Sequence, residues 1–320
     1  MKVIAFYIAH FDFRGTGNAV YNYAHYNEVI LENKSIILYK IPSLFPQFDN
    51  KDVYDMFRHR FSVYFFDTKD KLKNICDELN VSYIYFLCSG EDISPPILEY
   101  FPKNIKTIGH QVFKTNSTNA FDVSASISET VSKDTNIPYV YHIVDLPFNT
   151  NNMRKDLNIP EDAIVFGRIG GYETFDIQYV IEAILEVLKE ENNIYFVFAP
   201  RPYYFNINHP RVKYLDIIVD LNKKREFINT CDAMIHARKD GETFGISVLE
   251  FIYCNKPVFT TLGKDNQHII NLRNNAIIYR NKEELIQQIT TFNKSHYDIK
   301  LLEEFTPLNV MQKFKKIFLD

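Results

Sequence analysis

The chain has 320 residues, a length that suits two domains of ordinary size. Hydrophobic residues make up 46% of the chain and charged residues 24%, a balance that is typical of globular proteins. The formal net charge of −4 disfavours nucleic-acid binding as the main task. No apolar run approaches the length of a membrane span, and the apolar N-terminus lacks the cleavage site of a signal peptide.

The four cysteines show no Cys-x-x-Cys pair that would indicate a metal or redox site. They are Cys76, Cys88, Cys231 and Cys254. We therefore expect reduced, buried thiols in a cytoplasmic protein.

In the first half of the chain, strands alternate with helical segments, which predicts a parallel sheet. The predicted strands lie near residues 2–9, 35–41, 62–66, 82–88, 106–110, 123–127 and 139–144. The predicted helices lie near residues 17–32, 52–59, 69–79 and 129–134. Residues 146–152 are polar and rich in Pro and Asn, so we predict a linker there and a domain boundary between residues 147 and 148.

After this linker the same alternation begins again. Residues 164–168, 194–199 and 276–279 are predicted strands, and apolar residues at helical spacing predict a helix over 175–188. Asn281 with Glu284 resembles a capping box that opens the next helix, and a last helix is predicted near 308–319. The sequence thus predicts a second α/β domain over residues 148–306.

A glycine-bearing loop with Gly15 and Gly17 follows the first strand and opens a helix. Glycine lets the backbone approach a ligand, although an ordinary strand–helix turn has the same pattern. A dinucleotide site would need a third glycine and an acidic residue at the end of the second strand, where Lys40 stands instead. The loop therefore disfavours an NAD enzyme and remains a candidate contact for a phosphate or an acceptor.

Two carboxylates, Glu242 and Glu250, lie eight residues apart across the junction between a predicted loop and a predicted helix. The helix around Glu250 is apolar on nearly every side, so this carboxylate is costly to bury unless a partner hydrogen-bonds it. One interpretation is a buried glutamate that a neighbouring arginine or a backbone amide satisfies. The other is a ligand-binding carboxylate.

The stretches Glu242-Thr-Phe-Gly and Asn255-Lys-Pro-Val resemble the nucleotide-sugar site of retaining GT-B glycosyltransferases, similar to glycosyltransferase family 4. That family, which includes sucrose synthases and bacterial mannosyltransferases, has two glutamates separated by seven residues, with Phe-Gly after the first. The resemblance implies a GT-B fold, with two Rossmann-like α/β domains that face each other across a cleft. Residues 1–147 would be the acceptor domain, with a C-terminal helix at 307–320 packing back on it, and 148–306 the donor domain.

The resemblance also implies how donor groups are bound. Glu242 would face hydroxyls of the donor sugar, and Glu250 would accept hydrogen bonds from the ribose hydroxyls. The amides of Thr243, Phe244 and Gly245 would lie at a helix N-terminus, where unpaired N–H groups favour phosphate. Eight helical residues rise about 12 Å, a span comparable to a sugar, its diphosphate and a ribose.

The family has two cationic residues that bind the diphosphate, and this sequence matches only one of them. Arg168 matches the family's arginine, but Glu173 or Thr174 occupies the place of the family's lysine. A leaving diphosphate needs positive charge, so Lys239 or Arg201 is a candidate substitute. An equally good interpretation of Lys239 is a solvated lysine in a loop.

His110 ends a predicted strand at a place where the family often has a histidine beside the reacting sugar. We therefore predict His110, Arg168 and Glu242 as the catalytic residues. His10, at the end of the first strand, is a further candidate, whereas His236 has the alternative of a packed core position.

The resemblance implies transfer of a sugar from a UDP- or GDP-sugar to a glycan, lipid or protein hydroxyl, with retention of anomeric configuration. We expect no metal and no cofactor apart from this donor, because the sequence has no Asp-x-Asp at a strand end. One alternative is a non-catalytic nucleotide-sugar-binding protein, which the missing lysine favours. The other is a nucleotide-sugar epimerase of the same fold, which would need further acid–base groups in the N-terminal domain.

Overall fold

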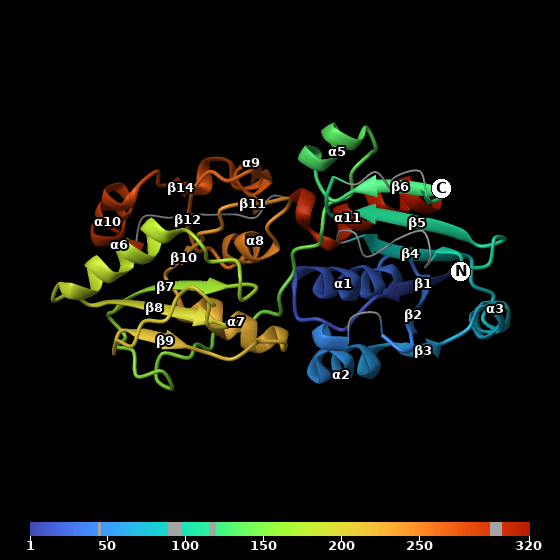
Figure 1. Ribbon diagram of the computed structural model, residues 1–320, viewed down its shortest axis with the longest axis horizontal. Helices are drawn as coiled ribbons and strands as arrows, with labels where there is room; N and C mark the ends of the chain where they lie inside the picture. Colours follow the sequence, from blue (N-terminus) through green and yellow to red (C-terminus); the bar gives the residue numbers. More distant parts are fainter. Residues whose placement is uncertain (44–45, 89–97, 115–119, 295–302) are drawn as a thin grey trace. The chain divides into compact units, whose positions relative to one another are not determined.

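The computed structural model describes residues 1–43, 46–88, 98–114, 120–294 and 303–320, and its elements are drawn in Figure 1. The chain forms two compact units. The first comprises Met1–Ile143 and Glu303–Asp320, and the second comprises Val144–Leu302. None of the helices in the described ranges combines the length and the hydropathy that a membrane-spanning helix needs.

The first unit is built on a parallel sheet of six described strands, in the order β3-β2-β1-β4-β5-β6. The strands are β1 Val3–Ile8, β2 Lys34–Lys40, β3 Ser62–Phe66, β4 Tyr83–Cys88, β5 Lys106–Gln111 and β6 Val123–Ser126. The chain thus builds outward from β1 to one side and then returns to build the other side from β4. Strand alternation with helices therefore predicted six of the strands in this unit.

The helices of the first unit cover both faces of this sheet. They are α1 Gly15–Val29, α2 Lys51–Arg60, α3 Lys69–Glu78, α5 Glu129–Thr135 and α11 Pro307–Phe314. Side-chain caps begin three of them, because Asn50, Thr68 and Ser128 accept hydrogen bonds from the first-turn amides of α2, α3 and α5. The four helices predicted before residue 148 are all confirmed, with ends that differ by a few residues.

The prediction of a strand over residues 139–144 is wrong. The segment is extended, but it makes one isolated bridge to β6, between Ser126 and Tyr139. Further along, side chains take its carbonyl groups: the Tyr23 hydroxyl donates to Tyr141 O, and His110 Nε2 lies 2.8 Å from Val140 O. Buried apolar residues gave the segment a strand-like pattern, although its carbonyls bind side chains and not a neighbouring strand.

The second unit contains another parallel sheet of six described strands, in the order β14-β12-β10-β7-β8-β9. The strands are β7 Ile164–Ile169, β8 Ile194–Ala199, β9 Val212–Tyr214, β10 Ala233–Ile235, β12 Val258–Thr260 and β14 Ala276–Ile278. Here the chain begins in the middle, builds β8 and β9 to one side, and then returns to build β10, β12 and β14 on the other. The order of strands therefore reverses between β7 and β10.

Helices cover both faces of the second sheet as well. They are α6 Gln178–Lys189, α7 Leu221–Thr230, α8 Ile246–Tyr253, α9 Gln267–Leu272 and α10 Lys282–Thr290. One apolar core lies between the sheet and α6 and α10, and a second lies between the sheet and α7 and α8. The predicted cap of α10 is confirmed, since the Asn281 side chain accepts from the Glu284 amide at 2.8 Å.

A two-stranded parallel pair, β11 Gly241–Glu242 and β13 Asp265–Asn266, lies outside the main sheet. Gly241 has a φ of +67°, and a Cβ at this position would lie 1.8 Å from the carbonyl oxygen of Asp265. Only glycine fits such a position. The pairing therefore fixes the backbone of Glu242, the residue that follows.

The C-terminal segment belongs to the first unit. After α11 the chain continues as a π-helical turn, η6 Lys315–Leu319. The ring of Phe314 stacks on Tyr23 of α1 at 5.5 Å, and the Tyr83 hydroxyl donates to Leu319 O at 3.3 Å. Residues from both ends of the chain therefore share one core.

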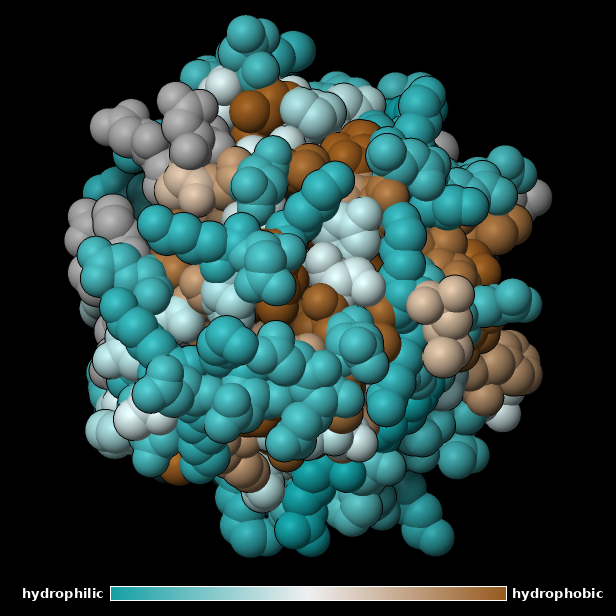
Figure 2. Space-filling model, turned by 90° about the vertical axis from the view of Figure 1, so that its right-hand side faces the viewer, coloured by the Kyte–Doolittle hydropathy of each residue, from teal (hydrophilic) through white to brown (hydrophobic). Residues whose placement is uncertain are grey.

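The face of the molecule drawn in Figure 2 is mostly hydrophilic, with hydrophobic residues visible between the polar ones near its middle. A mixture of this kind is ordinary for protein surfaces, because polar groups cannot cover the whole of one.

We expect Phe314→Ala to destabilise the first unit by about 3–5 kcal/mol, because it removes a fully buried aromatic ring. Denaturant unfolding followed by circular dichroism measures this. The control is Leu308→Ala on the same helix, whose side chain is 53% exposed; it should change stability by less than about 0.5 kcal/mol. Equal effects of the two substitutions would contradict the packing of α11 described here.

Candidate functional site

The reversal of strand order in the second sheet brings two loops together. Strands β7 and β10 are paired neighbours, with Ala233 opposite Phe166 and Met234 opposite Gly167. The loops that follow them therefore leave the sheet side by side at its carboxyl edge. In open α/β sheets, ligands bind at this kind of reversal.

Glu242, in the loop after β10, has a partner on each carboxylate oxygen. His236 Nε2 lies 3.3 Å from Oε1, and Arg238 Nη1 donates to Oε2 at 2.8 Å. Burial raises the pKa of Glu242, but the hydrogen bond from His236 and the charge of Arg238 outweigh it, so the pKa lies below its usual value. Glu242 is therefore an ionised hydrogen-bond acceptor with a fixed position.

His236 is itself held by contacts to Thr260 and Tyr279. Its Nδ1 lies 2.9 Å from Thr260 Oγ1, and the same hydroxyl oxygen lies 3.1 Å from His268 Nε2. Tyr279 donates to the backbone carbonyl of His236 at 2.5 Å. Burial lowers the pKa of His268 to about 3, which keeps its ring neutral. His236 is thus a packed residue, as one interpretation proposed, and it also orients Glu242.

Arg168, on β7, is buried to 2% exposure, and its guanidinium holds the turn that follows the strand. Nη1 donates to Pro200 O at 3.3 Å and to Gly170 O at 3.4 Å, and Nη2 donates to Gly171 O and to the Thr174 hydroxyl. Burial lowers its pKa to about 10, although nearby carboxylates act in the opposite direction. Thr174, one of the two residues where a lysine was expected, is thus bound to Arg168.

Glu250, in α8, is buried and forms an ion pair with Lys224 of α7, with 2.9 Å between Lys224 Nζ and Glu250 Oε1. Its partner is therefore a lysine, and not the arginine or backbone amide considered from the sequence. Helix α8 begins only at Ile246, so Glu242 lies outside it. The span estimated from eight helical residues therefore does not apply to the two glutamates.

The residues between Glu242 and α8 form a tight turn. Gly245 has a φ of +86° and precedes the helix, and a Cβ there would lie 3.0 Å from the Cβ of His268. The Phe244 carbonyl accepts from Asn271 Nδ2 at 2.9 Å, and its ring is buried. Thr243 is partly exposed. The predicted phosphate-binding amides therefore stand on a rigid turn at the start of α8.

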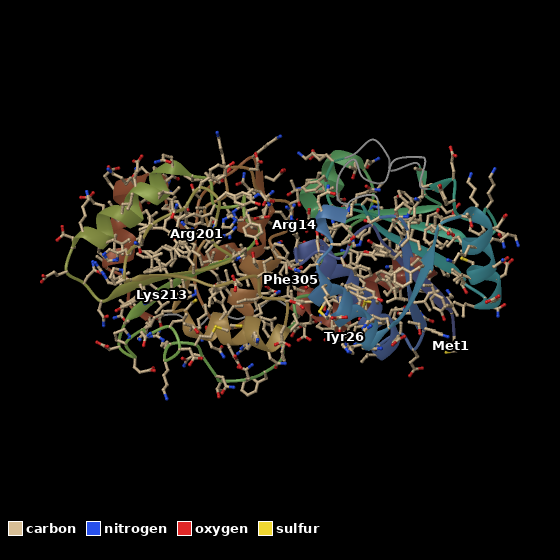
Figure 3. The ribbon with its side chains drawn as sticks, turned by 60° about the horizontal axis from the view of Figure 1, so that its bottom comes forward. Met1, Arg14, Tyr26, Arg201, Lys213 and Phe305 are labelled. Carbon is tan, nitrogen blue, oxygen red and sulfur yellow. The ribbon has the colours of Figure 1, made fainter. Side chains whose placement is uncertain are left out.

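The cation beside Glu242 is Arg238, which the sequence reasoning missed. The side chain of Lys239 is exposed, and its backbone amide donates to Asp176 Oδ1 at 2.8 Å. Arg201, labelled in Figure 3, lies over the ring of Tyr214 at 4.9 Å. The signal that could have identified Arg238 is its position four residues before Glu242, in the segment that follows a strand.

In the first unit, the two glycines predicted in the loop after β1 lie in the first turn of α1, which begins at Gly15 directly after Arg14, labelled in Figure 3. Gly15 is exposed, whereas Gly17 is buried against Asp12, and a Cβ on Gly17 would lie 2.3 Å from Asp12 O. The Asp12 carboxylate lies 3.0 Å from His10 Nε2. Close packing of the first turn of α1 on Asp12 therefore explains Gly17 without a ligand.

His110 lies in the interior of the first unit with an exposure of 0%. Its Nδ1 lies 2.7 Å from the Tyr85 hydroxyl, its Nε2 lies 2.8 Å from Val140 O, and its ring packs on Phe318 of η6. Burial lowers its pKa to about 4. These contacts are those of a structural histidine, and they give no support to the predicted catalytic role.

Residues 160–294 match the model of the family "Glycosyl transferases group 1", a segment that contains Arg168, Glu242 and Glu250. No curated protein matches the chain.

Several solved structures share the fold of the whole chain. HepE of Anabaena, in complex with UDP and glucose, is 13% identical with a TM-score of 0.68, covering 98% of this chain and 95% of HepE. A glycosyltransferase of Rickettsia africae is 13% identical with a TM-score of 0.68, covering 100% and 99%. A putative UDP-N-acetylglucosamine 2-epimerase of Listeria monocytogenes is 11% identical with a TM-score of 0.62, covering 100% and 97%. The predicted GT-B fold of two Rossmann-like α/β domains is therefore confirmed.

We expect the buried His110 to make stability depend on pH. Between its usual pKa of 6.5 and its folded value of about 4, the unfolded chain binds a proton that the folded protein does not. Stability should therefore fall as the pH drops through this window, with up to about 3 kcal/mol from this residue. Urea unfolding of the wild type and of His110→Gln at pH 7 and pH 4.5 measures it. The same loss of stability between pH 7 and pH 4.5 in both proteins would contradict the assignment of this pH dependence to His110.

We expect Lys224→Met to cost about 3–5 kcal/mol, because it leaves the buried Glu250 carboxylate without its cation. The double variant Lys224→Met/Glu250→Met should recover most of this loss, since no buried charge remains. The control is Arg280→Met, which breaks an ion pair with Glu284 whose arginine is 70% exposed; it should cost less than about 1 kcal/mol. Guanidinium unfolding gives all three values, and a cost for Lys224→Met as small as that of the control would refute the prediction.

Proposed function

We propose that the protein is a glycosyltransferase that moves a sugar from a nucleotide-diphosphate sugar to a hydroxyl acceptor, with retention of anomeric configuration. The observation that carries the proposal is Glu242, an ionised carboxylate fixed by His236 and Arg238 where the strand order reverses. A carboxylate of this kind suits the hydroxyls of a sugar, because charged acceptors form the stronger hydrogen bonds.

Two further findings support the proposal. The segment that matches the family model contains the whole carboxyl edge around β7 and β10. HepE, whose fold is similar, is described in complex with UDP and glucose, which favours a UDP-sugar among the possible donors.

In the proposed reaction each group has a separate task. Glu242 accepts hydrogen bonds from hydroxyls of the donor sugar, and Glu250, held by Lys224, accepts from the ribose. The amides of Thr243, Phe244 and Gly245 meet the diphosphate at the start of α8. Arg168 stiffens the adjoining turn and adds positive charge behind it.

The bond from the anomeric carbon to the phosphate oxygen breaks, and a bond to the acceptor oxygen forms on the same face of the sugar. The departing phosphate oxygen takes the proton of the acceptor hydroxyl. This route needs no separate general base, so the buried position of His110 does not oppose it. It also needs no metal ion, if protein cations neutralise the leaving diphosphate.

A nucleotide-sugar epimerase is the second candidate, because the similar Listeria protein is described as a putative UDP-N-acetylglucosamine 2-epimerase. Both reactions would use the same donor contacts in the second unit. They differ in the product: a transferase releases a nucleoside diphosphate together with a glycoside, whereas an epimerase alters the sugar.

The test is a thermal-shift screen with UDP-, GDP-, ADP- and dTDP-sugars, followed by product analysis by NMR, with and without EDTA. We expect one nucleotide to stabilise the protein, slow release of its sugar with unchanged anomeric configuration, and no effect of EDTA. Stabilisation without release, even with candidate acceptors, would favour a binding protein. An isomerised sugar would favour an epimerase, and an inverted product or loss of activity in EDTA would overturn the mechanism.

We expect Glu242→Gln to lower kcat/KM for the donor roughly 10- to 100-fold, because it weakens a charge-assisted hydrogen bond worth about 1.5–3 kcal/mol. Gln keeps the shape of the side chain, so the melting temperature should stay close to that of the wild type. Steady-state release of nucleoside diphosphate measures the effect. Wild-type kcat/KM in this variant would remove Glu242 from the site.

A further inference from the structure

The two glutamates of the candidate site have cations of very different exposure. The side chains of Lys224 and Glu250 are each only 6% exposed. Those of Arg238 and Glu242 are 29% and 19% exposed. Removing one partner of a buried ion pair strongly destabilises the protein, because the other charge stays buried without its counter-ion. A partly exposed ion pair contributes little to stability and is separated at little cost. Arg238 and Glu242 are therefore the pair that a ligand can separate.

Two other arginines among the described residues at this edge of the sheet already have partners. The guanidinium of Arg168 donates to three backbone carbonyls and one hydroxyl, so its hydrogen bonds serve the turn after β7. The hydroxyl belongs to Thr174, where the family pattern has its lysine at 173 or 174. Arg201 lies over the Tyr214 ring.

Arg238 has the position and the chemistry that the missing lysine would have supplied. It lies in the segment between β10 and β11, and β10 is the strand that neighbours β7. The charge of Arg238 lowers the pKa of Arg168, whereas the charge of Glu242 raises it. An arginine presents its donors as a planar fork, which matches the oxygens of a phosphate. Its present partner, Glu242, is the group proposed to meet the donor sugar.

We propose that Arg238 is the diphosphate-binding cation of this protein, and that donor binding exchanges its partner from Glu242 to the phosphate that carries the sugar. This inference rests on the proposed function. The exchange leaves neither group without hydrogen-bond partners, since Arg238 gains a phosphate, while Glu242 keeps His236 and gains sugar hydroxyls. Because Glu242 meets the sugar, the phosphate within reach of Arg238 is the β-phosphate of the nucleotide.

The exchange has a consequence that a purely structural ion pair would not have. Without a sugar, Glu242 competes with the β-phosphate for Arg238. Neutralising Glu242 should therefore strengthen the binding of a free nucleoside diphosphate, while it weakens the use of the sugar donor. A substitution that merely damaged the site would weaken both.

The experiment compares the binding of UDP and UMP by isothermal titration calorimetry, with GDP and GMP measured in the same way. We expect Arg238→Gln to weaken the binding of UDP or GDP, whichever binds the wild type, roughly 10- to 100-fold. The binding of the corresponding monophosphate, which lacks the β-phosphate, should weaken less than threefold. Arg238→Lys should fall between, because it keeps the charge and loses the fork. The matched control is Lys239→Gln, at the next residue, which should change both affinities less than twofold.

Glu242→Gln provides the second measurement, and we expect it to bind the diphosphate up to about fivefold more tightly than the wild type. Circular dichroism melting checks that each variant is folded. If Arg238→Gln does not fold, Arg238→Lys takes its place in the comparison. Equal loss of di- and monophosphate binding in the Arg238 variants, or unchanged diphosphate binding, overturns the inference while the proposed function stands. Absence of binding of UDP, GDP, ADP and dTDP to the wild type overturns both the inference and the proposed function.

Discussion

The reversal of strand order between β7 and β10 is the constraint on which the candidate site depends. Because the chain begins the second sheet in its middle, two loops that lie about 70 residues apart in sequence leave adjacent strands at the same edge. One loop carries the turn held by Arg168, and the other carries Arg238 and Glu242. The small β11–β13 pair then fixes the second loop, and it does so only because Gly241 can adopt a positive φ.

Around this edge, burial decides which ionic contacts are permanent. The Lys224–Glu250 pair joins two helices that cover one face of the sheet, and both charges are shielded from water. Breaking it would leave a charge that the interior cannot solvate, so this pair holds a fixed geometry. The Arg238–Glu242 pair stands partly in water and can be separated at little cost. The Glu250 carboxylate thus keeps its cation, whereas the Glu242 carboxylate, which His236 also holds, can give up its contact with Arg238.

The fold could be predicted from sequence because alternating strands and helices determine a parallel sheet on each side of a linker. Spacing and residue type also predicted Glu242 and Glu250 as candidate site residues, which stays a prediction. Their partners could not be found in this way, because Lys224 lies 26 residues before Glu250 and meets it only through the packing of α7 on α8. The strand predicted over 139–144 failed for a similar reason, since the hydroxyl of Tyr23, from a distant helix, takes one of its carbonyls.

His110 shows most clearly what a strand end can and cannot indicate. Its place at the end of β5 suggested a catalytic position, but the C-terminal segment places Phe318 against its ring and helps to bury it. The match to the family model covers only residues 160–294, which lie within the second unit. The donor contacts proposed for Arg238, Glu242 and Glu250 lie within this match, whereas the match does not reach the first unit. His110 is enclosed by Tyr85, Val140 and Phe318, so a position at a strand end that suggests chemistry is here part of the interior packing.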